Sequence, residues 1–132
     1  MMGAAVDRLK RRPEFIRAAR RGRSCATPGL VLQVYSRGDG DAPLRVGYTA
    51  SKKVGNAVIR NRARRRLRAV VDAIALQNAK TGRDYVLIAR GGTPGRPYAA
   101  LERDFETALK RLDSWRSDGA GPDESDQTGR AV

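Results

Sequence analysis

The segment best suited to chemistry is residues 51–68, SKKVGNAVIRNRARRRLR, which carries eight positive charges and no acidic residue. Ammonium and guanidinium groups bind phosphate, and the planar arginine fork can contact two phosphate oxygens at once. Like charges four residues apart on a helix repel each other by roughly 0.2–0.5 kcal/mol per pair. A polyanion relieves that repulsion, whereas a helix kept only for packing would interleave glutamates. The segment therefore predicts contact with phosphate groups, and an ordinary solvated face is the alternative.

Other chemistries find little support in the residue types. The chain has no histidine, which removes the commonest general base and zinc ligand. Cys25 is the only cysteine, so an intrachain disulfide is excluded, and we expect a buried, inert thiol. The acidic residues Asp7, Asp72, Asp84 and Asp104 are scattered, which argues against a protein-based metal nuclease. We expect neither catalytic residues nor a metal site on this chain.

The charge of the whole chain supports a polyanionic partner. Its 132 residues carry a formal net charge of +13, and arginines far outnumber lysines, a bias that suits nucleic acid but equally fits genome composition. The N-terminus lacks the apolar stretch of a secretory signal, and no run of about 18 apolar residues occurs. We therefore expect a cytoplasmic protein with no membrane partner and no disulfide-linked partner.

A long helix over residues 56–77 would position the basic side chains. At 100° per residue its apolar residues fall in one sector, the expected core stripe, and several polar residues fall opposite. Lys52 and Lys53 precede the helix, where free backbone N–H groups favour phosphate, although an ordinary turn is the alternative. The expected core stripe is Ile59, Ala63, Leu67, Val70 and Ile74, and the opposite side carries Asn61, Arg64, Arg65 and Arg68.

The remaining pattern predicts a small domain with both helices and strands. Helices are expected over 13–21 and 98–115, and strands over 30–36, 44–50 and 85–89, with a short strand at 24–28. The strands over 30–36 and 44–50 are expected to pair as an antiparallel hairpin. The last helix carries its core stripe at Leu101, Phe105, Ala108, Leu112 and Trp115. Residues 1–7 are predicted to be a flexible N-terminus, 8–116 an RNA-binding domain, and 117–132 a disordered acidic tail.

The basic segment resembles the signature of the bacterial ribonuclease P protein subunit. That signature runs Ser-Lys-Lys-apolar-Gly-x-Ala-Val-x-Arg-Asn-Arg-x-(Lys/Arg)-Arg with a further arginine, and residues 51–68 fill every fixed position. The likeness extends over about residues 8–115. It includes Arg8-Leu9-Lys10-Arg11, Glu14-Phe15, Arg45-Val46-Gly47, Asp84-Tyr85-Val86 and Arg90.

The resemblance implies a fold and a function. The fold is α+β, an α/β sandwich with a small central mixed sheet and a left-handed β-α-β crossover, like the second domain of a ribosomal small-subunit protein. General chain-handedness rules would favour a right-handed crossover. The function is that of an accessory, non-catalytic subunit that binds ribonuclease P RNA and the 5′ leader of precursor tRNA. Mg²⁺ would be held mainly by the RNA subunit and the substrate.

The resemblance also assigns residues to two sites. A leader-binding cleft would hold Phe15, Gln33, Tyr35 and Thr49. The sequence departs from many family members at Ala19 and Gln33, where they carry aromatic residues, so leader recognition here would rest more on charge and hydrogen bonds. The residues implied to contact the catalytic RNA are Lys52, Lys53, Asn56, Arg60, Asn61, Arg62, Arg64, Arg65 and Arg68.

Three other functions fit parts of the sequence. A ribosomal or other structural RNA-binding protein would explain the charge but not the full signature. A helix-turn-helix DNA-binding protein is disfavoured because the basic helix follows a strand. A membrane-surface helix would need large apolar residues where Ala63 and Val70 stand.

Overall fold

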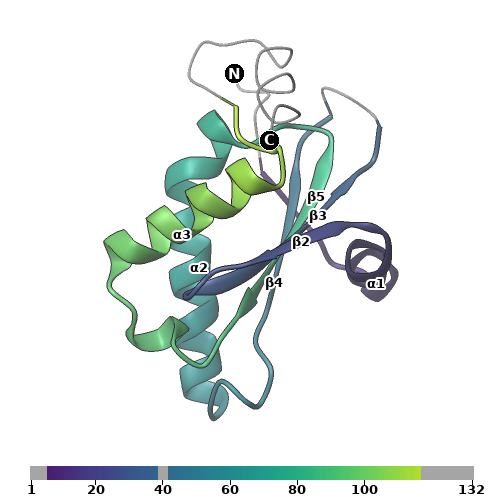
Figure 1. Cartoon of the computed structure of the whole chain (residues 1–132). Coiled ribbons are helices and arrows are strands. Elements are labelled where there is room, and N and C mark those ends of the chain that lie inside the picture. Colours follow the sequence, from purple (N-terminus) through teal and green to yellow (C-terminus); the bar gives the residue numbers. More distant parts are fainter. Residues whose placement is uncertain (1–5, 39–41, 117–132) are drawn as a thin grey trace.

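A five-stranded mixed sheet with helices on both faces organises the chain (Figure 1). The structure is a computed structural model that describes residues 6–38 and 42–116. Residues 1–5 and the predicted acidic tail therefore lie outside the described residues. The helices are α1 (Arg12–Arg21), α2 (Ala57–Asn78) and α3 (Tyr98–Arg111), with a 3-10 turn η1 (Thr93–Gly95). The strands are β1 (Asp7–Arg8), β2 (Arg23–Ala26), β3 (Leu30–Ser36), β4 (Arg45–Thr49) and β5 (Arg83–Ala89).

Strand β5 occupies the centre of the sheet, whose order is β1-β4-β5-β3-β2. It pairs antiparallel with β3 and parallel with β4. The predicted hairpin between residues 30–36 and 44–50 is therefore wrong, because β5 lies between the two strands. The physical reason is that residues 85–89 are apolar on both faces, which suits a central strand covered on both sides. Helix α2 makes the crossover from β4 to β5, and the left hand implied for it stays a prediction.

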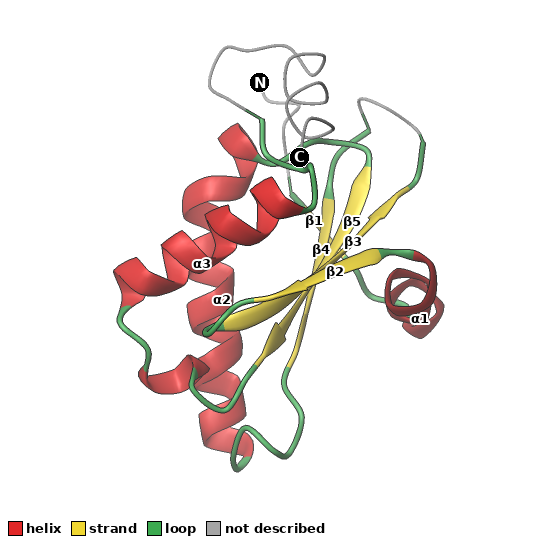
Figure 2. Ribbon diagram, viewed as in Figure 1, coloured by secondary structure: helices red, strands yellow, loops and turns green. Residues whose placement is uncertain are grey.

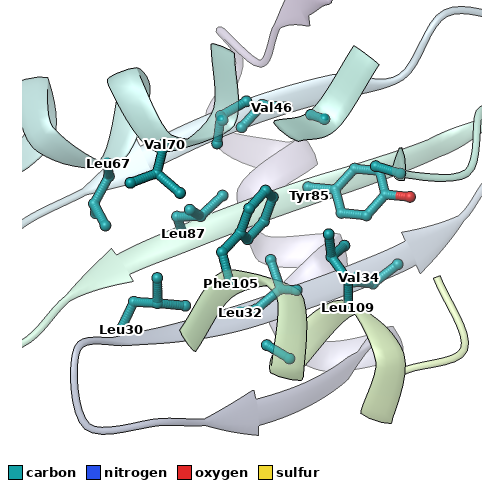
Figure 3. Packing of buried hydrophobic residues seen from close by; sticks show 14 of the residues in the cluster. Leu30, Leu32, Val34, Val46, Leu67, Val70, Tyr85, Leu87, Phe105 and Leu109 are labelled. Atoms are coloured by element: carbon teal, nitrogen blue, oxygen red, sulfur yellow. The ribbon is translucent and has the colours of Figure 1, made fainter. Parts of the chain in front are cut away.

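The main core lies between the sheet and the layer formed by α2 and α3 (Figure 3). The Phe105 ring points from α3 into this core near Leu32 of β3 and Leu87 of β5, and all three side chains are buried. Four of the five stripe residues predicted for the last helix are buried, whereas Trp115 lies beyond the end of α3 and is half-buried. The chain leaves the helix at Leu112, and Trp115 instead forms a β-bridge with Ala79.

The core stripe of α2 is rotated from the predicted one. Ala63, Leu67 and Val70 are fully buried as expected. Ile59 is 37% exposed and packs over Gly55 in the first turn, and Ile74 is half-buried. Val71 and Ala75 are buried as well, in the core cluster to which α3, β4 and β5 also contribute.

Helix α1 lies on the opposite face of the sheet from α2 and α3 (Figure 2). It covers a smaller apolar cluster in which Ala18 and Val86 are buried and Phe15 is half-buried. A Cβ atom at Gly47 would lie 2.5 Å from the Phe15 ring, so only glycine lets α1 approach β4 this closely.

Two short segments complete the sheet edges. At one edge, β1 pairs in parallel with β4, although two residues are too few for a sequence pattern to reveal a strand. At the other edge, β2 confirms the predicted short strand. Cys25 lies on β2 and is half-buried, so its thiol is less enclosed than expected. No helix in the described ranges is long and apolar enough to cross a membrane.

Candidate RNA interface

The cations of the signature form a continuous surface along the first half of α2 and the turn before it. We call this surface the basic ridge. Its side chains are exposed or half-exposed, and within residues 6–38 and 42–116 none of them pairs with a carboxylate. The ridge therefore presents positive charge that the protein leaves uncompensated. It consists of Lys52, Lys53, Arg60, Arg62, Arg64, Arg65 and Arg68.

A tight turn and an N-cap fix the start of the ridge. The Gly55 N–H donates to the Lys52 carbonyl oxygen at 3.2 Å, and Gly55 adopts a φ of 151°, which favours glycine. Asn56 then caps α2, because its Oδ1 accepts the N–H of Ile59 at 3.0 Å. Lys52 and Lys53 are exposed in this turn, next to the free N–H groups of the helix. Asn56 thus has a structural task in addition to its predicted contact with RNA.

The ridge arginines form two rows. In the inner row, Arg60 donates to the Gly55 carbonyl oxygen at 3.1 Å, Arg64 donates to Asn61 Oδ1 at 2.5 Å, and Arg68 stacks 5.4 Å above the Tyr48 ring. Of these contacts, only that of Arg68 joins the ridge to β4. The outer row consists of Arg62 and Arg65, which are exposed, and the exposed Asn61 lies beside it.

Arg66 lies in the same segment but faces the protein. It donates hydrogen bonds to the carbonyl oxygens of Thr93 at 2.8 Å, Pro94 at 2.9 Å and Arg96. Arg96 is itself paired with Asp104 at 2.6 Å. Arg66 therefore fastens η1 to α2, a role that the run of arginines in the sequence does not distinguish from RNA binding.

A second group of arginines surrounds Asp84 on the other face of the sheet. Asp84 is fully buried, and its oxygens accept hydrogen bonds from Arg17 at 3.0 Å, Arg37 at 2.7 Å and Arg45 at 2.8 and 2.9 Å. Arg45 also pairs with Glu14 at 2.8 Å. We call this group the Asp84 cluster.

Charge pairing sets the ionisation of the Asp84 cluster. Burial alone would raise the pKa of Asp84, but the hydrogen bonds from Arg45, Arg37 and Arg17 outweigh burial and lower it. The hydrogen bond to Asp84 in turn raises the pKa of Arg45. The cluster joins α1, β4 and the chain after β3 to the central strand. Sequence reasoning did not assign this role to Asp84, because its partners are distant in the chain.

The sequence-predicted leader residues lie on the α1 face of the sheet. Gln33 lies across β5 from Gly47, which the Phe15 ring covers, and Thr49 lies on the next rung towards the end of β4. All three predicted residues are half-buried, so the structure brings Phe15, Gln33 and Thr49 onto one partly open strip. Tyr35 shares this face, but Arg17 lies 4.4 Å above its ring and covers it.

The described part of the chain contains no group of three or more cysteine, aspartate or glutamate side chains that could hold a metal ion.

The fold and the ridge together define an α+β protein with an exposed basic surface built on a β-α-β crossover, a combination typical of RNA-binding domains. Comparison with known proteins narrows this class. The family model described as Ribonuclease P matches residues 4–113. The chain therefore belongs to the ribonuclease P protein family.

Individual relatives agree with that assignment. The ribonuclease P protein component of Gluconacetobacter diazotrophicus is 50% identical over 110 residues, covering 83% of this chain and 94% of the relative. That of Paramagnetospirillum magneticum is 50% identical over 114 residues, covering 84% and 86%. The solved RNase P protein of Staphylococcus aureus is 25% identical with a TM-score of 0.69, covering 83% of this chain and 97% of that one. The RNase P protein from Thermotoga maritima shares the fold, with a TM-score of 0.65 at 21% identity, covering 76% and 93%.

Proposed function

We propose that this chain acts as the RNA-binding protein subunit of ribonuclease P and assists the removal of the 5′ leader from precursor tRNA. The observation that carries the proposal is the basic ridge, whose cations have no carboxylate partner in the described residues. Uncompensated arginines on an exposed helix gain most from a dense polyanion, since each phosphate contact releases condensed counterions. Membership of the ribonuclease P protein family supports the catalytic RNA as that polyanion.

In this proposal, the two sides of the molecule bind different RNA strands. The basic ridge, with Asn56 and Asn61, contacts the ribonuclease P RNA. The strip with Phe15, Gln33 and Thr49 receives the single-stranded leader on the α1 face. The RNA subunit performs the cleavage and holds Mg²⁺ together with the substrate, in the cytoplasm.

A reconstitution assay tests the function directly. Purified full-length protein is mixed with precursor tRNA, with and without ribonuclease P RNA, at low and high Mg²⁺. We expect no cleavage by the protein alone and a large stimulation of cleavage at low Mg²⁺ when the RNA is present. Equal affinity for unrelated structured RNAs without stimulation would instead identify a structural RNA-binding protein of the ribosomal type.

The outer row of the ridge provides a sharper test. The double variant Arg62→Ala/Arg65→Ala should reduce the slope of log affinity against log salt by about 1.4–1.8, if each arginine contacts one phosphate. The matched control is Arg103→Ala/Arg111→Ala, which removes the same charge from exposed positions on α3. An equal loss of slope in both variants would mean that net charge, and not the ridge, determines RNA binding.

A further inference from the structure

A cavity of about 290 Å³ lies between the β1–β4 edge of the sheet and α2. Its rim is formed by Arg8 of β1, Tyr48 of β4, and Arg64 and Arg68 of α2. Two of these arginines belong to the inner row of the basic ridge. Arg8 comes from a part of the chain 56 residues before Arg64, and nothing in the signature helix indicates it.

Strand β1 places Arg8 at this rim. Arg8 lies opposite Val46 in the parallel pairing of β1 with β4. The Asp7 N–H donates to the Leu44 carbonyl oxygen and the Leu9 N–H to that of Val46, each at 3.0 Å. These bonds hold the backbone on both sides of Arg8, so its side chain is carried by an ordered strand next to α2.

The cavity offers positive charge that no carboxylate on its rim neutralises. Its lining contains no acidic residue, and within the described ranges neither Arg8, Arg64 nor Arg68 forms an ion pair. Burial, followed by the charge of Asp72, raises the pKa of Tyr48, so its hydroxyl stays protonated and can donate a hydrogen bond. An anion is the ligand that satisfies all of these groups.

The anion is a phosphate group and not a base. A base would need an open apolar or aromatic surface on which to stack. Leu9 and Val46, which also line the cavity, are only 6% and 2% exposed, and Arg68 already stacks on Tyr48. The half-buried Phe15 ring lines the cavity as well, but it packs against Gly47. The cavity therefore presents mainly guanidinium and hydroxyl groups, which match phosphate oxygens and carry no preference for a particular base.

We propose that this cavity binds one phosphate group of an RNA strand that passes around the β1–β4 edge, with Arg8 as an RNA-binding residue outside the signature helix. This inference rests on the proposed function, because it extends the ridge towards the leader-binding face. An adjoining groove of about 560 Å³ shares Arg8 and is lined also by Lys10 and Arg11, together with Asp7, Glu14 and Arg45. It continues the basic path from the cavity to the start of α1.

A double-mutant cycle tests whether Arg8 and Arg64 share one phosphate. The variants are Arg8→Gln, Arg64→Gln and the double variant in the full-length protein, with Arg103→Gln as the matched control. Each pocket variant should weaken RNA binding about tenfold, as expected for a lost charge-assisted hydrogen bond. The affinity loss of the double variant should be far smaller than the product of the two single losses, because both arginines act on the same phosphate. The affinity losses of Arg64→Gln and Arg103→Gln should instead multiply when the two are combined.

Two sets of binding measurements identify the RNA strand that supplies the phosphate. Affinity is measured for ribonuclease P RNA alone, and for precursor and mature tRNA with the assembled ribonucleoprotein. A loss with the RNA alone assigns the phosphate to the catalytic RNA, and a loss confined to precursor tRNA assigns it to the leader. Arg8→Lys, which keeps the charge, should retain most of the affinity, and urea unfolding checks that all variants are folded.

The outcomes separate the two proposals. If Arg8→Gln behaves like Arg103→Gln while Arg62→Ala/Arg65→Ala still weakens binding, the cavity does not bind RNA and the proposed function stands. Multiplicative effects of Arg8→Gln and Arg64→Gln would overturn the shared phosphate. Failure of the wild-type protein to bind or stimulate the RNA would overturn both proposals.

Discussion

The Asp84 cluster and the basic ridge place arginines in opposite surroundings on the two faces of one small sheet. Arg17, Arg37 and Arg45 converge on a buried carboxylate, which fixes them as parts of the fold. The ridge arginines have no carboxylate partner in the described residues and depend on carbonyl, amide and aromatic groups for support. Convergence on a buried acid marks Arg17, Arg37 and Arg45 as structural, whereas the density of positive charge alone does not separate structural arginines from those proposed to bind RNA.

Removing the carboxylate of the Asp84 cluster should have the largest effect on stability. Asp84→Asn leaves three guanidinium groups around a neutral, buried amide, and breaking a buried ion pair in this way costs about 3–5 kcal/mol. Urea unfolding at fixed salt measures the loss. Glu106→Gln breaks only the exposed Glu106–Lys110 pair on α3 and should cost less than about 1 kcal/mol. Similar losses in the two variants would contradict the structural role of the cluster.

The stability difference between wild type and Asp84→Asn should also depend on pH. Because the folded pKa of Asp84 lies below its unfolded value, its contribution is fully present above the ordinary carboxyl pKa of about 3.9 and disappears as pH falls through the folded pKa. The stability difference between wild type and Asp84→Asn should therefore stay constant from neutral pH down to about pH 5 and shrink only in stronger acid. A difference that shrinks between pH 7 and pH 5 would contradict the lowered pKa.

Within α2, Arg66 is the arginine with a structural role and Arg62 is the exposed ridge arginine, so the two can be compared in one helix. Arg66→Met leaves the carbonyl groups of η1 without their donor, which should cost about 1–3 kcal/mol and leave the salt dependence of RNA binding unchanged. Arg62→Met should do the reverse, with stability retained and the salt slope reduced. Unfolding curves and salt titrations of both variants decide the assignment. An altered salt slope in Arg66→Met would place Arg66 on the RNA face.

Asn56 caps α2 and is also proposed to contact RNA, and its replacement should give the smallest effect. Asn56→Ala removes the N-cap of α2 and should cost about 1 kcal/mol. Asn56→Ser keeps a capping oxygen and should restore stability, while RNA affinity should remain below wild type because the amide group is lost. Full recovery of affinity in Asn56→Ser would assign Asn56 to the cap alone.

The sequence predicted the elements of the fold better than their arrangement. Alternating and helical apolar patterns located β3, β4, α2 and α3 closely, because those periods are local. The order of strands is not local, and the hairpin predicted between β3 and β4 was wrong for that reason. The continuous apolar run of β5 was the available signal for a central strand.

In the candidate site, too, local features could be predicted from the sequence and non-local ones could not. The charge pattern located the basic ridge, since it depends only on spacing along one helix. The RNA contacts implied by the resemblance left Arg66 out. The charge pattern alone gave Arg66 no structural role, because the carbonyl groups that bind it lie about 30 residues later. Neither the Asp84 cluster nor the position of Arg8 beside α2 follows from local sequence, because both depend on strand pairing.

The central position of β5 has a consequence for protein synthesis. Strands β1 and β4 on one side and the β2–β3 hairpin on the other are translated before β5, yet only β5 joins them. A nascent chain that ends before residue 83 can therefore form the hairpin and α2 but not the complete sheet. The whole basic segment, residues 51–68, is therefore synthesised before the strand that completes the sheet.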